Sequence, residues 1–155
     1  MAVIGGGSAR TPAALYALAQ VTGQTGLTID EVALYDIDAG RLALMNQIAQ
    51  AMLADQAAPT RADRVAPMRV ITTERPEDAL AGADFVVLTV RVGGEAARAT
   101  DERIALNHGC IGQETTGAAG FAYALRSIPV VLHYVELAGR LAPGSTIINF
   151  TNPAG

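Results

Sequence analysis

Two arginines in a charged segment, residues 91–120, are of a type and spacing that could bind a substrate. Guanidinium groups grip planar anions through two N–H bonds, so Arg91 and Arg98 could neutralise and orient an anionic substrate. The alternative is an ion pair with one of three nearby acids on one helical turn: Glu95, Asp101 or Glu102. For Arg103 we favour that alternative. Connections in α/β domains usually need about 2–6 residues, so a segment this long and charged is predicted to contact a ligand.

A carboxylate and an amide supply two further candidates. Glu114, in a polar stretch flanked by glycines, could orient or tune a neighbouring acid–base group. The alternative is that Glu114 or Thr115 caps the following helix. Asn152 follows an apolar strand and could donate to and accept from a substrate hydroxyl, with Pro153 setting the turn. The alternative there is an ordinary Asx-Pro turn.

The N-terminal turn Gly5-Gly6-Gly7-Ser8 is typical of a nucleotide-binding loop. Glycines let the backbone approach a pyrophosphate, and the following helix supplies N–H donors. The fingerprint is partial, because Arg10 stands where a third glycine is usual, and the alternative is a plain tight turn. Asp36, just after the second strand, could bind ribose hydroxyls and repel a 2′-phosphate, which favours NAD over NADP. Its alternative role is a helix N-cap, for which Asp38 is the better candidate.

The other potentially reactive side chains show no pattern typical of a catalytic or metal-binding residue. His108 and His133 lack the partner spacing of metal ligands, and His133 is expected to be structural. Nothing indicates a lowered pKa for Cys110, which we interpret as a bystander. We therefore expect no metal site within this chain.

The elements that must position these residues alternate between strands and helices. Apolar runs predict strands over residues 3–4, 32–35, 68–72, 85–90 and 145–150. Helices are predicted to open at Thr11-Pro12, over 42–52 and 76–80, and over 121–135, where Pro129 should kink or divide the helix. This alternation predicts an α/β fold with an open, doubly wound parallel sheet.

Composition narrows the class of protein. The 155 residues suffice for one domain, and half are hydrophobic, which fits a sheet buried on both faces. The net charge of −4 argues against a nucleic-acid partner. No apolar run approaches the roughly 20 residues of a membrane span, so no membrane partner is expected. The single cysteine excludes a disulfide framework and suits the cytoplasm.

The order of motifs closely resembles the NAD-dependent family-4 glycoside hydrolases, which include 6-phospho-β-glucosidases and 6-phospho-α-glucosidases. These motifs are GGGS and TP, then DID, then RVGG…AR…DERI…HG…GQETTG, then ALRSIP and NFTNPAG. The resemblance implies a Rossmann-like, lactate/malate dehydrogenase-like fold. DERI, HG and TNPAG lean towards the β-acting members. Ala105 in place of a usual proline, and the Ser8-Ala9-Arg10 sequence, are departures that we expect to be tolerated.

The resemblance implies hydrolysis of a 6-phosphoglycoside sugar phosphate by C3 oxidation with NAD, C2 deprotonation by a tyrosine, and elimination. A divalent metal, typically manganese, stabilises the enediolate. Gly5, Gly6, Gly7, Ser8 and Asp36 would hold NAD, Arg98 and Asn152 would contact substrate, and Glu114 would raise the basicity of the tyrosine. The metal ligands and the tyrosine base fall beyond Gly155 in such enzymes, so those roles go to no residue here.

We expect residues 1–155 to be the NAD-binding domain of a longer enzyme, because the chain stops where such sheets bind ligands. The fragment alone is expected to be inactive. The complete enzyme is expected to be cytoplasmic and oligomeric. Two other readings stay open. One is a lactate/malate-type dehydrogenase, which the GQET segment disfavours. The other is a nucleotide-binding module without catalysis.

Overall fold

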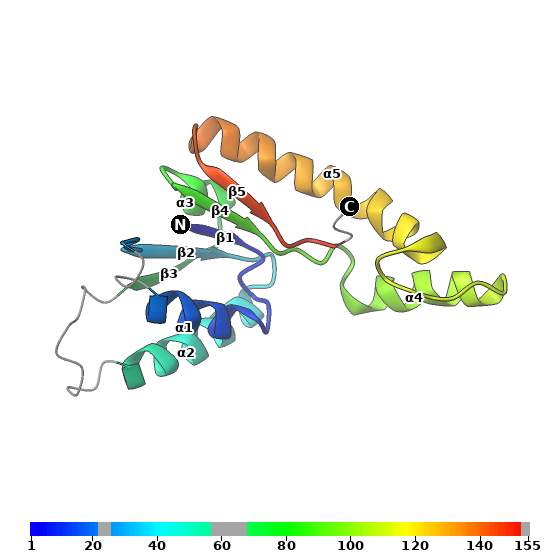
Figure 1. The fold of residues 1–155 in the computed structure, drawn as a ribbon, viewed down its shortest axis with the longest axis horizontal. Coiled ribbons are helices and arrows are strands. Elements are labelled where there is room, and N and C mark those ends of the chain that lie inside the picture. The colour runs from blue at the N-terminus through cyan, green and yellow to red at the C-terminus, as the bar shows by residue number, and fades with distance from the viewer. Residues whose placement is uncertain (22–25, 57–67, 153–155) are drawn as a thin grey trace.

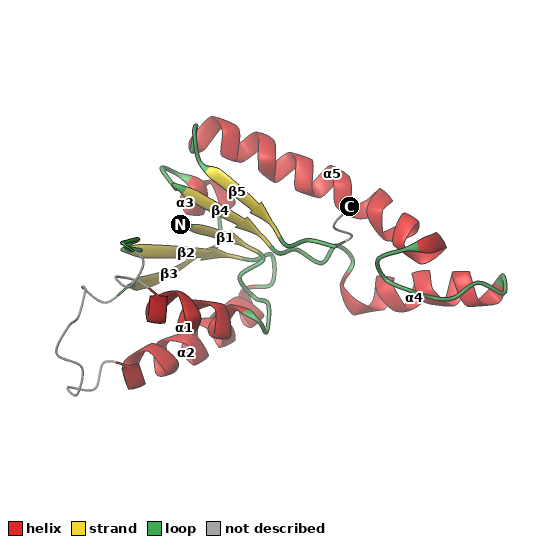
Figure 2. Cartoon of the chain, viewed as in Figure 1, coloured by secondary structure: helices red, strands yellow, loops and turns green. Residues whose placement is uncertain are grey.

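The protein, represented by a computed structural model, is an α/β domain built on one parallel sheet (Figures 1 and 2). The structure describes residues 1–21, 26–56 and 68–152. In the order β3-β2-β1-β4-β5, the five strands are β3 (Arg69–Thr73), β2 (Glu31–Tyr35), β1 (Ala2–Ile4), β4 (Phe85–Leu88) and β5 (Thr146–Asn149). All four pairings are parallel. The Rossmann-like, doubly wound sheet predicted from the sequence is confirmed.

Helices cover both faces of the sheet because strand side chains alternate between them. α1 (Thr11–Val21) and α2 (Ala39–Gln56) lie on one face, and α3 (Pro76–Leu80) and α5 (Gly117–Leu141) lie on the other (Figure 1). Val3 of β1 packs with the α1 and α2 residues Leu15 and Leu42. Its neighbour Ile4 packs on the opposite side, in the cluster that contains Leu80 and Leu137. Two apolar cores therefore enclose the central strands.

Backbone contacts tie together the carboxyl ends of the three central strands. The Tyr35 carbonyl oxygen accepts hydrogen bonds from the amides of Gly5 at 2.9 Å and Gly6 at 2.8 Å. The Thr89 amide donates to the Ile4 carbonyl oxygen at 2.8 Å. A Cβ added to Gly5, whose φ is +99°, would lie 2.3 Å from the Thr89 carbonyl oxygen. Only a glycine fits this approach without backbone movement.

The charged segment after β4 differs from the sequence prediction of a single long connection. It contains the 14-residue helix α4 (Gly94–Asn107), which lies beyond the carboxyl ends of the strands and packs mainly against α5 (Figure 1). The turn into α4 uses Gly93 in the left-handed conformation, with φ +81°. α5 is continuous through Pro129, so of the two predicted effects of this proline the division of the helix is wrong, and the kink stays a prediction.

Parts of α5 and β5 present apolar side chains to solvent. On α5, Phe121, Leu125, Ile128 and Leu132 follow one another at helical spacing and are each more than half exposed. By length and composition alone α5 could cross a membrane. That is weak evidence, because Leu137 on the same helix is buried in the core. The absence of a membrane partner stays a prediction.

The close approach at Gly5 can be tested by Gly5→Ala. We expect the free energy of unfolding to fall by about 2–4 kcal/mol, because the methyl group adds a backbone clash to an unfavourable φ. Gly82→Ala is the matched control. Gly82 also has a positive φ, +68°, but a Cβ there would meet no atom within 4 Å. Urea denaturation should show a loss of only about 1 kcal/mol for the control. Equal losses would contradict the steric explanation.

Candidate active site at the carboxyl ends of the strands

The glycine loop and the end of β2 form one half of the candidate site. The Gly7 amide donates to Asp36 Oδ2 at 2.8 Å, and the Asp38 amide donates to Asp36 Oδ1 at 2.9 Å. A Cβ on Gly7 would lie 2.9 Å from the carboxylate carbon of Asp36. The loop therefore rests directly on the acid, and each carboxylate oxygen keeps acceptor capacity for a ligand hydroxyl.

At the end of β2, Asp38 and not Asp36 caps the following helix, whereas ribose binding by Asp36 stays a prediction. Asp38 precedes α2, and its Oδ1 accepts the Arg41 amide at 2.9 Å, which is N-cap geometry. Asp36 does not cap the helix but binds the glycine loop. Ser8 lies at the end of the loop, where its Oγ accepts the Arg10 amide at 3.3 Å. These residues fit a dinucleotide, because the loop has no side chains where its backbone meets Asp36.

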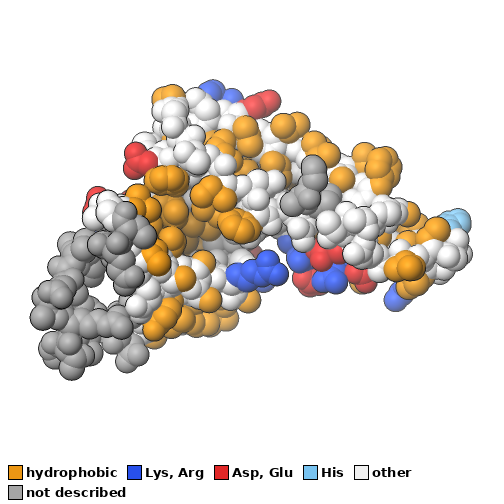
Figure 3. Space-filling view, in the orientation of Figure 1, with side chains coloured by type: hydrophobic (Ala, Val, Ile, Leu, Met, Phe, Trp, Pro, Cys, Tyr) orange, Lys and Arg blue, Asp and Glu red, His pale blue; other side chains and the backbone are white. Residues whose placement is uncertain are grey.

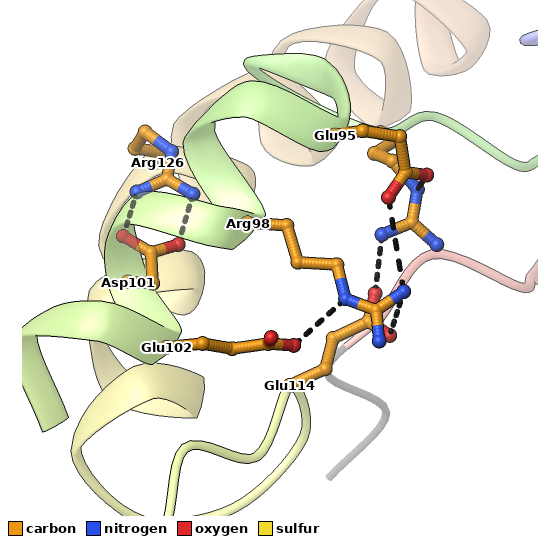
Figure 4. Close-up of polar contacts among 7 residues, drawn as sticks. Glu95, Arg98, Asp101, Glu102, Glu114 and Arg126 are labelled. Carbon is orange, nitrogen blue, oxygen red and sulfur yellow. Dashed lines mark hydrogen bonds and ion pairs between the residues drawn. The ribbon is translucent and has the colours of Figure 1, made fainter. Parts of the chain in front are cut away.

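The second half is a group of five charged side chains, here called the Glu114 cluster: Arg91, Glu95, Arg98, Glu102 and Glu114. Arg91 Nη1 lies 2.5 Å from Glu114 Oε1, and Arg98 Nη1 lies 3.6 Å from Glu114 Oε2. Glu114 thus joins an arginine that follows β4 to one on α4 (Figure 4). Its side chain is 17% exposed, whereas that of Arg98 is 42% exposed. Figure 3 shows acidic and basic side chains gathered at the end of α4 nearest the strands.

The ion pairs predicted as the alternative for Arg91 and Arg98 are present. Arg98 Nε donates to Glu102 Oε1 at 2.9 Å, and Glu95 contacts Arg91 at 3.2 Å and Arg98 at 3.7 Å. The hydrogen bond to Glu102 and the charge of Glu114 raise the pKa of Arg98 above its ordinary value. Three carboxylates therefore face two guanidinium groups. The cluster is an oriented network rather than an open anion clamp.

Glu114 does not cap α5, so that alternative is wrong. The N-cap position is Thr116, which makes no side-chain capping bond. The Thr116 hydroxyl instead donates to the Gln113 side chain. Freed from capping, Glu114 is directed at the arginines.

Asn152 lies at the end of the strand next to β4. The adjoining Thr151 is buried, and its Oγ1 accepts the Val90 amide at 3.2 Å. The Thr151 amide donates to Asn149 Oδ1 at 3.0 Å. These bonds hold Asn152 at the same edge of the sheet as Arg91. Pro153, part of the predicted Asx-Pro turn, lies outside the described residues.

Sequence reasoning missed a partly buried ion pair beside the Glu114 cluster. Asp101 pairs not with Arg98 but with Arg126 of α5, through Oδ1 to Nη1 at 2.8 Å and Oδ2 to Nη2 at 2.5 Å. The guanidinium carbon of Arg126 lies 5.5 Å from the Tyr123 ring centre, a cation–π contact. Burial raises the pKa of Tyr123. The ALR and DERI motifs contain these residues, but no local pattern links positions 25 apart.

The remaining candidates do not join the site. Arg103 makes no ion pair within the described residues, contrary to our preference. His133 lies on the exposed side of α5 with its ring 5.2 Å from that of Tyr134. Cys110 is exposed, and its Sγ lies 3.7 Å from the His108 carbonyl oxygen. No group of three or more His, Cys, Asp or Glu side chains suited to a metal occurs in residues 1–21, 26–56 and 68–152.

A shallow depression of about 260 Å³ lies elsewhere, at the amino ends of the strands. It is lined by residues such as Met1, Asp30 and Asp84, and by none of the predicted site residues. In sheets of this type ligands bind at the carboxyl ends. We therefore locate the candidate site at the glycine loop, Asp36, the Glu114 cluster and Asn152.

The sheet is of the Rossmann-like, doubly wound type, and the polar candidate residues gather at the carboxyl ends of its strands. The model of the family 4 glycosyl hydrolases matches residues 1–155, and the chain belongs to that family. The resemblance seen in the sequence motifs is confirmed.

Curated relatives act on 6-phosphorylated glucosides of both anomers. The chain is 37% identical over 155 residues to 6-phospho-β-glucosidase BglT of Thermotoga maritima, covering all of this chain and 34% of the relative. It is 40% identical over 154 residues to a 6-phospho-β-glucosidase of Escherichia coli, covering 98% of this chain and 32% of that protein. It is 37% identical over 152 residues to 6-phospho-α-glucosidase 1 of Lacticaseibacillus paracasei, with 98% and 32% covered. The chain thus spans about a third of these relatives.

Solved structures agree with the fold. The 6-phospho-β-glucosidase of Thermotoga maritima with manganese, NAD⁺ and glucose-6-phosphate superposes with a TM-score of 0.86 at 37% identity, covering 99% of this chain and 34% of that one. A malate dehydrogenase from Salinibacter ruber gives a TM-score of 0.55 at 15% identity, covering 98% of this chain and 36% of that one. The latter likeness concerns the fold alone and confirms the predicted dehydrogenase-like architecture.

The central place of Glu114 in its cluster predicts that its substitution destabilises the protein more than substitution of Glu95. Glu114→Gln should lower the melting temperature more than Glu95→Gln, although both carboxylates contact the same two arginines. The reason is exposure, since the Glu95 side chain is 72% exposed and that of Glu114 17%, and solvent screens exposed pairs. Thermal unfolding at low and high salt measures both losses. A larger loss for Glu95→Gln would contradict the arrangement.

Proposed function

We propose that this chain is the NAD-binding, substrate-orienting domain of a metal-dependent glycosidase that cleaves 6-phosphoglycosides. The observation that carries the proposal is the location of the Glu114 cluster. It lies at the carboxyl edge of the same sheet as the glycine loop and Asp36, in a chain of family 4. Relatives described with NAD, manganese and glucose-6-phosphate support this assignment.

The cofactor half of the proposal assigns residues to binding. Gly5, Gly6 and Gly7 bring the backbone close to the pyrophosphate, with Ser8 at the end of the loop, just before α1. Asp36 accepts hydrogen bonds from the ribose hydroxyls while its other contacts hold it against the loop. Bound there, NAD supplies reversible hydride transfer at the C3 position of the sugar.

The substrate half assigns orientation to the polar residues. Arg98, Asn152 and Arg91 hold the sugar phosphate, and the two arginines also pair with the two carboxylate oxygens of Glu114. Glu114 is the catalytic residue of this chain, and its carboxylate increases the basicity of a tyrosine supplied from outside residues 1–155. Ligands for the divalent metal, manganese by analogy with relatives, also come from outside.

Several finer points stay proposals. The preference for β-glycosides rests on motif details, because relatives of both anomeric types are similarly identical. Cytoplasmic location and homo-oligomer formation stay predictions, as does the absence of nucleic-acid and membrane partners. We likewise propose that residues 1–155 form one NAD-binding domain, and that this domain alone is inactive.

Two other functions are distinguished by simple measurements. A lactate/malate-type dehydrogenase would form NADH in net amounts, but its likeness to this chain is one of fold only. A non-catalytic module would bind NAD and turn over no glycoside. Glu114, held by two arginines, favours the glycosidase, because plain hydride transfer does not need a carboxylate that tunes a carbon-acid base.

The Asp36 assignment predicts tighter binding of NAD than of NADP. Asp36→Ala should weaken the discrimination by about 1–3 kcal/mol, since the ribose hydroxyls lose a partner and a 2′-phosphate is no longer repelled. Calorimetric titration with both cofactors measures the difference. Asp38→Ala is the control: it removes the helix cap and should leave the NAD/NADP ratio unchanged. Equal or tighter NADP binding by the wild-type protein would overturn the assignment.

The elimination mechanism predicts exchange of the substrate C2 hydrogen. The complete enzyme should need NAD, a divalent metal and reducing conditions, and deuterium from solvent should appear at C2 of the product. Chromogenic 6-phospho-β-glucoside and its α-anomer serve as substrates. Turnover without NAD, or without C2 exchange, would indicate ordinary acid–base hydrolysis instead.

Arg98→Ala in the complete enzyme should abolish most turnover with little change in melting temperature, because the side chain is partly exposed.

A further inference from the structure

The orientation of α4 decides where Arg98 points. This helix lies beyond the ends of the strands and its main packing partner is α5, not the sheet (Figure 1). Only two of its residues are buried, Asp101 and Ala105. An alanine and a carboxylate offer little apolar area. Hydrophobic packing therefore does little to fix the rotation of α4 about its own axis.

The contact between Asp101 and Arg126 fixes the rotation of α4 that apolar packing leaves undetermined. Both carboxylate oxygens of Asp101 receive an N–H group from Arg126, at 2.8 and 2.5 Å, in a fork-to-fork geometry. The Asp101 side chain is 7% exposed. Such a bidentate pair specifies angle as well as distance, unlike a contact between two apolar groups.

Arg126 is itself held from several sides. Its Nη1 also lies 3.4 Å from the Ala122 carbonyl oxygen, and its guanidinium group stands over the Tyr123 ring. A Cβ built on Gly93, just before α4, would lie 3.5 Å from Arg126 Nε. Arg126 therefore contacts α4 near its middle, at Asp101, and lies close to the turn that enters the helix.

The two ion-pair systems are attached to the same helix. Arg98 and Asp101 are three residues apart on α4, so they are neighbours on its surface. Figure 4 shows Asp101 directed at Arg126, while Arg98 is directed at Glu102 and Glu114. A rotation of α4 that broke the first pair would also move Arg98 relative to Glu114.

We propose that the partly buried Asp101–Arg126 pair is a positioning pair that sets Arg98 and Glu114 for substrate. This rests on the proposed function for the roles of Arg98 and Glu114. A buried ion pair often adds little net stability, because desolvation offsets the attraction. Its benefit here is the angle it imposes on α4. Asp101 and Arg126 are not among the residues assigned to cofactor or substrate, and in this proposal they act only through Arg98 and Glu114.

The test is a double-mutant cycle in the complete enzyme. Asp101→Asn should lower kcat/KM for the 6-phosphoglucoside by about 10-fold or more, as expected for misplaced substrate contacts, with the Kd of NAD unchanged. In an Arg98→Ala background the same substitution should have almost no further effect, because the pair acts through Arg98. Fully multiplicative losses would overturn the proposal. Glu31→Gln, which breaks an exposed pair with Arg69, is the control and should leave kcat/KM unchanged.

A second variant distinguishes loss of the ion pair from loss of folding. The double substitution Asp101→Leu with Arg126→Met replaces the ion pair by apolar side chains, which proteins often tolerate with equal or greater stability. We expect a melting temperature near that of the wild type together with a similar 10-fold or greater loss of kcat/KM. Wild-type activity in this variant would show that packing alone orients α4 and would overturn the proposal.

Hydrogen exchange separates this inference from the proposed function. If the wild-type enzyme cleaves neither anomer, the proposed function fails, and the positioning role is judged without activity. Asp101→Asn should then speed amide exchange in residues 94–107 while leaving residues 11–21 unchanged. Unchanged exchange in residues 94–107 would overturn the positioning role, whatever reaction the enzyme catalyses.

Discussion

The carboxyl ends of β1, β2 and β4 meet through backbone groups, with no space for a side chain between them. Gly5 and Gly6 share the Tyr35 carbonyl oxygen, and Gly5 approaches the Thr89 carbonyl so closely that a methyl group would clash. This contact directs the chain from β1 across the end of β2, where Gly7 meets Asp36. It also places the end of β4, and hence Arg91, beside the loop. Both halves of the candidate site depend on it.

The two halves are stabilised by different physics. The cofactor half consists of backbone hydrogen bonds and one carboxylate on a sheet with an apolar core on each face. The Glu114 cluster stands on α4 and the adjoining segments, where ion pairs replace apolar packing. Its five charges are mostly paired and partly exposed, so they contribute more to orientation than to stability.

Pairing within the Glu114 cluster changes how its arginines are understood. Taken from the sequence, Arg91 and Arg98 suggest an open clamp for an anion. In the structure each already contacts Glu95 and Glu114, and Arg98 also contacts Glu102. An incoming sugar phosphate would exchange contacts within a preformed network. Such a network limits where the substrate can lie, because each group has a partner of defined geometry.

The sequence by itself determined the fold class, the alternation of strands and helices, the glycine loop and the family. Those features depend on local signals: apolar runs of strand length, a glycine turn between strand and helix, and motifs in a fixed order. It also separated Asp36 from the capping residue Asp38, because a cap must directly precede its helix. Each of these signals lies within a few neighbouring residues.

Only the tertiary structure decided how α4 is held. α4 went unrecognised in the sequence because its buried residues, Asp101 and Ala105, produce no apolar repeat. The partner of Asp101 is 25 residues away on another helix, and local spacing had suggested Arg98 instead. Helix α5 likewise continues through Pro129, a residue that by itself predicts a kink or a break. In each case contacts between distant segments outweighed local preference, and such contacts exist only once the chain has folded.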